Sequence, residues 1–143
     1  MASLSFTNLR VNIDENVHQI YLELTRGSVD QAEDVPFIKM PDLFVAAACI
    51  GASENRYKEL YKKRDIFSAD AFDTMSQIPV LIALAYKRIK ELDELSKPRL
   101  ILDICEGWAN GGIHNLYEQI KTGQGLRPLY RLIDFIVDEA ASS

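Results

Sequence analysis

Apolar residues recur at intervals of three and four along most of the chain, and this spacing places them on one face of an α-helix. The clearest helix is predicted from about Ile78 to Leu95, with an apolar stripe from Ile78 to Leu92 and charged residues on the opposite face. Residues 41–50 are apolar on nearly every side, which is typical of a central buried helix, here ended by Gly51. Further helices are expected over residues 12–25, 53–67, 68–75, 98–120 (interrupted at residues 110–112) and 126–140. The pattern predicts a mainly α fold, a compact bundle of six or seven short helices.

The first thirteen residues follow a different period. Leu4, Phe6, Leu9, Val11 and Ile13 partly alternate with polar residues, which predicts a short N-terminal strand. One strand needs a partner, so it must pair with another chain, pair with a segment that the pattern does not identify, or be irregular. We therefore predict a single domain over residues 1–143, with residues 1–13 as a strand or arm and residues 14–140 as the helical body.

Length and charge narrow the class of protein. A chain of 143 residues can bury enough surface to fold without a metal or a disulfide. Its net charge of -5 disfavours nucleic-acid binding over the whole surface, because phosphate binding needs concentrated Lys and Arg. Cys49 and Cys105 lie within apolar helical patterns, so we expect buried free thiols and a reducing compartment. The N-terminus does not resemble a signal peptide and no apolar run approaches the length of a membrane span, so we expect a cytoplasmic protein.

Residues 53–67 combine basic and aromatic side chains. This basic-aromatic tract comprises Arg56, Tyr57, Lys58, Tyr61, Lys62, Lys63 and Arg64. On a helix, Tyr57 and Tyr61 would share a face because they are four residues apart. The tract is a candidate contact for a protein partner or for DNA phosphates, and otherwise a solvated helix whose tyrosines complete the core. Five basic residues less three acidic ones leave only +2 over residues 53–67, so any DNA contact should be weak and sensitive to salt.

The stretch from Glu106 to Ile113 contains three glycines. Gly107 within a helical pattern costs about 1 kcal/mol relative to Ala, which indicates close packing. Gly111 and Gly112 favour a sharp turn, because glycine readily adopts positive φ, and Glu106 would then bond the amides that start the next helix. We interpret the stretch as a structural hinge, with a binding turn as the alternative. The candidate residues of that turn are Glu106, Trp108, Asn110, Gly111 and Gly112.

Reactive groups are scarce, and the sequence predicts no catalytic residue, no metal site and no cofactor. It has neither a phosphate-binding glycine motif nor the paired cysteine spacing of a zinc site. One enzymatic alternative joins Cys105 and His114 as nucleophile and base across the double-glycine turn, although Cys105 also fits the buried stripe. Another places a hard cation at acidic pairs with helical spacing, which are otherwise solvated faces. These pairs are Asp103/Glu106 and Asp134/Asp138.

An ordered series of residues resembles a family of small helical proteins associated with bacterial DNA phosphorothioation systems, the sulphur-modification defence loci. The resemblance covers most of residues 9–120, mainly through apolar and glycine positions, and one expected tyrosine is replaced by Trp108. The matching positions are Leu9, Arg10, Val11, His18, Tyr21, Pro36, Phe37, Met40, Asp42, Leu43, Phe44, Gly51, the basic-aromatic tract, Ile66, Phe67, Ile78, Pro79, residues 83–85 and residues 106–113. The resemblance implies a place beside modification and restriction genes, but it transfers no functional residue.

We therefore expect a non-enzymatic accessory component of a prokaryotic DNA-modification or defence system, which binds protein partners of its locus. We also expect a homo-oligomer, with the N-terminal strand as one candidate contact. One alternative is a DNA-binding regulator or recruitment factor, in which that strand pairs across a dimer and the basic-aromatic tract meets the DNA backbone. The other is the cysteine- or metal-dependent enzyme.

Overall fold

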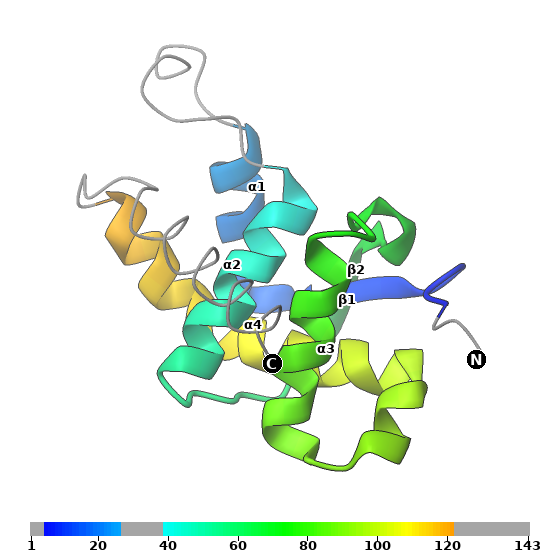
Figure 1. Ribbon diagram of the computed structural model, residues 1–143. Helices are drawn as coiled ribbons and strands as arrows, with labels where there is room; N and C mark the ends of the chain where they lie inside the picture. Colours follow the sequence, from blue (N-terminus) through cyan, green and yellow to red (C-terminus); the bar gives the residue numbers. More distant parts are fainter. Residues whose placement is uncertain (1–4, 27–38, 122–143) are drawn as a thin grey trace.

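A computed structural model describes residues 5–26 and 39–121, and within them it is mainly helical with a small two-stranded sheet (Figure 1). The α-helices are α1 (His18–Arg26), α2 (Met40–Ser53), α3 (Gln77–Ile89) and α4 (Pro98–Lys121), and the strands are β1 (Arg10–Asp14) and β2 (Lys63–Ser68). Within the described residues, the short 3-10 helices are η1 (Glu15–Val17), η3 (Ala69–Ala71) and η4 (Leu92–Ser96). No helix in these residues combines the length and apolarity needed to cross a membrane.

Helix α2 is the central element, as its apolar pattern predicts. Ten consecutive residues, Leu43–Ala52, are buried, and the helix packs against α4, α3 and α1. Pro41 lies in its first turn, where the missing amide hydrogen is not needed. The helix continues past Gly51 to Ser53, because Gly51 lies against the backbone of α4 and has no turn to make.

The N-terminal strand begins later than the alternation over residues 4–13 predicts, at Arg10, because Thr7 and Asn8 form a turn in which Asn8 adopts φ 66°. It finds its partner within the same chain. Strand β1 pairs antiparallel with β2, with Val11 opposite Phe67 and Ile13 opposite Arg64. The predicted helix over residues 53–67 is therefore wrong. Ile66 and Phe67 favour a strand, and Phe67 completes an aromatic cluster with Phe44 and Phe72, with ring centroids 5.2–5.9 Å apart.

Helix α3 is shorter than its stripe predicts. It ends at Ile89 because Lys90 adopts φ 61°, and the Lys90 amide donates to the Tyr86 carbonyl as a left-handed cap. Leu92, the last member of the predicted stripe, is 75% exposed on η4. The helix expected over residues 68–75 is only the single turn η3, which Ser68 caps by accepting from the Asp70 amide.

Helix α4 is continuous from Pro98 to Lys121, so the predicted break at residues 110–112 is wrong. This merger and the loss of two short helices leave four α-helices in the described residues, rather than the six or seven predicted. The predicted helix over residues 126–140 lies outside the described residues.

Candidate interaction surface

The basic-aromatic tract lies on a loop, residues 54–62, and on the first residues of β2. Helix α4 holds the loop by its backbone. The Lys58 amide donates to the Gly107 carbonyl over 3.1 Å, and the Asn110 side-chain amide donates to the carbonyls of Lys58 and Glu59. At its start, the Arg56 amide donates to the Gly51 carbonyl over 2.7 Å. An irregular segment of this kind needs such partners, because unpaired backbone polar groups are costly to bury.

The glycines of the late motif make this close approach possible. A Cβ atom on Gly111 would collide with the Arg56 carbonyl, and one on Gly112 would collide with the Ala47 carbonyl of α2. A Cβ atom on Gly107 would meet the Tyr57 ring. The double glycine is therefore a packing surface within one helix and not a turn between two.

Tyr57 and Tyr61 have different environments, which corrects the prediction that they share a face. The Tyr57 ring packs edge-on against Trp108, with centroids 5.2 Å apart, and the Arg88 guanidinium lies 3.6 Å from the Tyr57 centroid. Burial raises the pKa of Tyr57, with Arg88 opposing the rise. The Tyr61 side chain is 94% exposed. Tyr57 therefore anchors the loop, whereas Tyr61 is presented to solvent.

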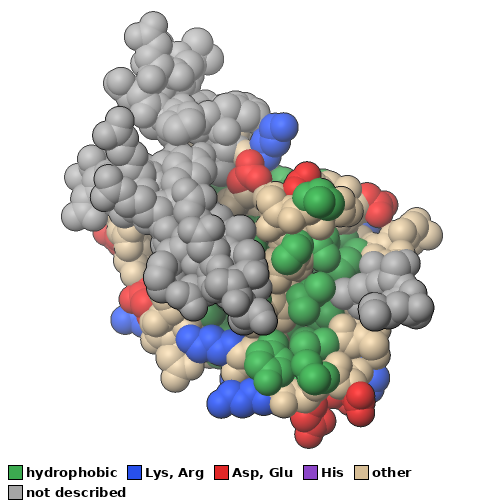
Figure 2. All heavy atoms as spheres, viewed as in Figure 1, with side chains coloured by type: hydrophobic (Ala, Val, Ile, Leu, Met, Phe, Trp, Pro, Cys, Tyr) green, Lys and Arg blue, Asp and Glu red, His purple; other side chains and the backbone are tan. Residues whose placement is uncertain are grey.

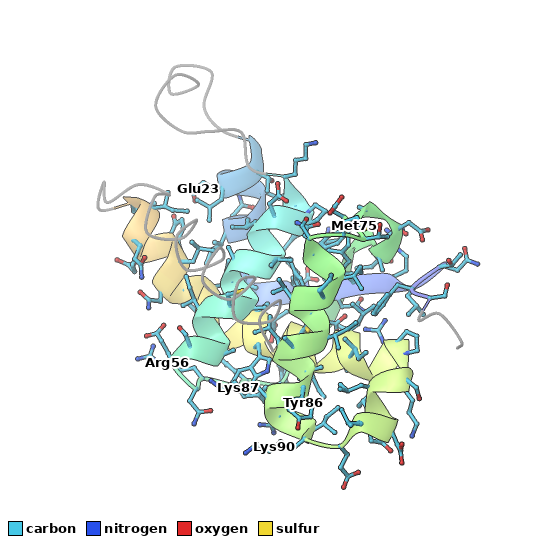
Figure 3. The ribbon with its side chains drawn as sticks, in the orientation of Figure 1. Glu23, Arg56, Met75, Tyr86, Lys87 and Lys90 are labelled. Carbon is cyan, nitrogen blue, oxygen red and sulfur yellow. The ribbon has the colours of Figure 1, made fainter. Side chains whose placement is uncertain are left out.

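The exposed members of the basic-aromatic tract form what we term the loop surface: Arg56, Lys58, Tyr61, Lys62, Lys63 and Arg64. Arg64 pairs with Glu15 at 2.8 Å. Lys87 and Arg88 of α3 adjoin the loop: Lys87 donates to the Ala52 carbonyl, and Figure 3 shows it near Arg56. Sequence reasoning missed this contribution, because Lys87 and Arg88 are ordinary exposed positions of the α3 pattern.

Asp14 fixes the far end of the loop, and sequence reasoning missed it as well. Its side chain is buried, accepting from the Tyr61 amide over 2.8 Å and from the Asn16 amide over 3.3 Å. Asp14 is thus the cap of the first helical turn. The sequence signal that could have identified this cap is an acidic residue between a predicted strand and a predicted helix.

Glu106 joins α4 to β1 instead of capping a following helix. Its buried carboxylate accepts from the Asn12 amide over 2.9 Å and from Arg99 over 2.7 Å. Arg99 also donates to the Arg10 carbonyl over 2.8 Å and pairs with Asp103. The pair therefore satisfies one amide and one carbonyl of β1, while β2 covers the other edge of that strand. Burial raises the pKa of Glu106, and the Asn12 amide and Arg99 oppose the rise.

The remaining members of the proposed binding turn face inward. Trp108 is buried and its indole donates to the Leu84 carbonyl over 3.0 Å, while Asn110 is occupied by the loop backbone. Glu106, Gly111 and Gly112 are packing and pairing residues, as described above. Trp108, Asn110 and Gly111 thus contact the loop, whereas Glu106 binds β1 and Gly112 packs against α2.

The two catalytic alternatives also have defined positions. Cys105 is fully buried, its thiol donates to the Leu81 carbonyl over 3.3 Å, and burial raises its pKa well above the usual range. His114 is exposed nine residues later on the same helix, about 13 Å along the axis and on the opposite side. The structure does not bring them together.

The second chemical alternative was a hard cation bound between acidic residues at helical spacing. Asp103 and Glu106 both bind Arg99, and Asp134/Asp138 lies outside the described residues. Within residues 5–26 and 39–121, no cluster of three His, Cys, Asp or Glu side chains is arranged to hold a metal ion.

Comparison with known proteins gives one finding. A family model described as DNA sulphur modification system-associated protein 4 matches residues 10–143. The match extends beyond residue 120, where the resemblance noted from individual positions ended. No curated protein and no solved structure matches the chain significantly.

Proposed function

The chain belongs to the family of DNA sulphur modification system-associated protein 4, and from this premise we propose that it is a non-enzymatic accessory component that binds a protein partner of such a system. The loop surface is the proposed contact. The partner's complementary face is acidic, with an apolar recess for Tyr61.

The proposal rests on Tyr61, which combines an exposed side chain with a fixed backbone. Its ring is 94% exposed, yet its backbone amide is fixed to the buried Asp14. A tyrosine on a fixed backbone loses little conformational freedom on binding, and tyrosine and arginine are enriched among the residues that dominate binding energy. Lys62 and Lys63, next in sequence, supply charges that favour encounter with an acidic surface.

The test is a binding titration of the full chain against each purified protein encoded with a DNA sulphur modification system. We expect one to bind, and Tyr61→Ala to weaken that binding by about tenfold or more. Leu92→Ala is the matched control, since Leu92 is also a large exposed apolar residue but lies on η4. Equal affinities for both variants, or the absence of binding by every protein tested, would refute the proposal.

A second candidate function is DNA contact through the same surface. The observation that favours it is the approach of Lys87 and Arg88 to the loop, which enlarges the basic area beyond the tract itself. The interspersed Glu54, Glu59 and Asp65 oppose it, because they repel phosphates.

Salt dependence separates the two candidates. If DNA binds, the affinity for duplex falls steeply with salt, and changing Lys62, Lys63 and Arg64 to Ala makes the slope shallower. If duplex does not bind at low salt, the DNA candidate is excluded and the protein-binding proposal is unaffected.

A further inference from the structure

An apolar band follows the outer face of α3. Met75, just before the helix, is 86% exposed and Tyr86 is 45% exposed, while Pro79 is exposed and Ala83 is half-buried between them. Their separations of four and three residues place Pro79, Ala83 and Tyr86 on one side of α3, and Met75 lies in the turn that precedes the helix. Figure 2 shows this band over α3, and Figure 3 shows Met75 and Tyr86 near its two ends. Large apolar side chains grouped in this way are typical of interaction sites.

We propose that this band, which we term the α3 face, is the contact with a second copy of the chain, with the two α3 helices packed antiparallel about a two-fold axis. In a two-fold contact the same patch serves both subunits and must be complementary to itself. Antiparallel packing of the two α3 helices makes the patch complementary to itself. When Met75 of one copy lies opposite Tyr86 of the other, Pro79 lies opposite Ile82, a half-buried residue next to Ala83. Apolar side chains then meet both at the ends of the contact and near the axis.

The charges flanking α3 fit the same arrangement. Asp73 precedes the helix, whereas Lys90 lies at its end. Antiparallel packing brings the acidic start of each helix beside the basic end of the other. Parallel packing would instead bring like charges together. The acidic residues of η4 follow Lys90 and lie beyond the paired span.

Strand β1 offers no competing route to a dimer. Its one edge is paired with β2, and the Arg10 carbonyl and Asn12 amide bind Arg99 and Glu106. A contact based on one helix from each copy is small, so we expect a dimer that dissociates on dilution.

The test measures the mass of the full chain by sedimentation over a range of concentrations. Two single variants, Met75→Lys and Tyr86→Glu, each place a charge opposite an apolar residue of an identical copy. We expect each alone to weaken dimerisation by about tenfold or more.

Mixed in equal amounts, the two variants should form a heterodimer close to wild-type affinity. At one end of that heterodimer the introduced lysine faces the introduced glutamate, and at the other end the native Met75 and Tyr86 still meet. His114→Glu, which places a charge at an exposed position of α4, is the control and should leave the dimer unchanged.

Each other outcome overturns the proposal. A wild-type chain that is monomeric at all concentrations means that the α3 face serves another occupant. Single variants that remain dimeric place the contact elsewhere. Single variants that are monomeric both alone and mixed exclude the antiparallel arrangement. Thermal melting of each variant confirms that it is folded, and none of these results depends on the partner binding assigned to the loop surface.

Discussion

Glu106 places a negative charge where only 1% of its side chain is exposed. Its burial raises the pKa above the usual value of a glutamate, while the Asn12 amide and Arg99 stabilise the ionised form. For a carboxyl group of this kind, the folded chain binds more protons than the unfolded chain at pH values between the two pKa values. Its contribution to stability therefore falls as the pH rises through that window.

Removal of the positive charge of Arg99 should raise the pKa of Glu106 further and so widen the pH interval over which stability falls. Arg99→Met leaves the buried carboxylate without its cation, so we expect the free energy of unfolding to fall by about 2 kcal/mol at neutral pH. The value is below that of a fully buried pair because the Arg99 side chain is 40% exposed. Denaturant unfolding from about pH 4 to about pH 8 should show the deficit growing as pH rises. Arg10→Met, which removes an exposed pair with Asp65, is the control; an equal effect there would contradict the assignment.

At the scale of elements, α2 and α4 approach so closely that their glycines meet main-chain atoms. A Cβ atom on Gly51 would collide with the Trp108 carbonyl, and one on Gly112 with the Ala47 carbonyl. Two consecutive glycines weaken an isolated helix by about 1 kcal/mol each, which is why the sequence pattern favoured a break. The packing of α4 against α2 and the loop outweighs that cost.

Gly112→Ala should accordingly destabilise the protein although alanine is the better helix former. Overpacking typically costs about 1–3 kcal/mol, and the cost here lies in the upper part of that range because the Cβ atom meets backbone atoms rather than a flexible side chain. It therefore exceeds the gain of about 1 kcal/mol in helix propensity. We expect a net loss of about 1–2 kcal/mol in the free energy of unfolding, measured with denaturant. His114→Ala, two residues along on the exposed side of α4, should be neutral or slightly stabilising. A stabilised Gly112→Ala chain would refute the close contact.

For the whole molecule, the periodicity of apolar residues predicted individual elements but not how distant segments pair. The buried α2, the stripe of α3, the N-terminal strand and the buried thiols followed from periodicity and composition. The antiparallel strand and the loop did not, because Lys63–Ser68 becomes a strand only through β1 and the aromatic cluster with Phe44. For the site, the basic-aromatic residues were identified, but not the groups that hold them, since Asp14 and Asn110 are distant in sequence from the loop. Long-range partners of this kind leave little trace in periodicity.

The loop surface should therefore depend on residues that a partner never touches. Asp14→Asn keeps the shape of the side chain but offers its carbonyl oxygen to only one of the two amides, those of Asn16 and Tyr61. An unsatisfied amide of this kind costs about 1–3 kcal/mol, so we expect the Tyr61 amide to exchange its hydrogen about tenfold faster.

Partner binding should weaken along with this local opening, because a mobile Tyr61 must be ordered on binding. The Lys58 amide, bonded to the Gly107 carbonyl of α4, is the internal control and should exchange at its original rate. If both amides exchange faster by the same factor, the variant has lowered global stability, and Asp14 does not act on the loop alone. If Tyr61 exchanges faster while binding is unchanged, the fixed backbone of the loop is not what a partner recognises.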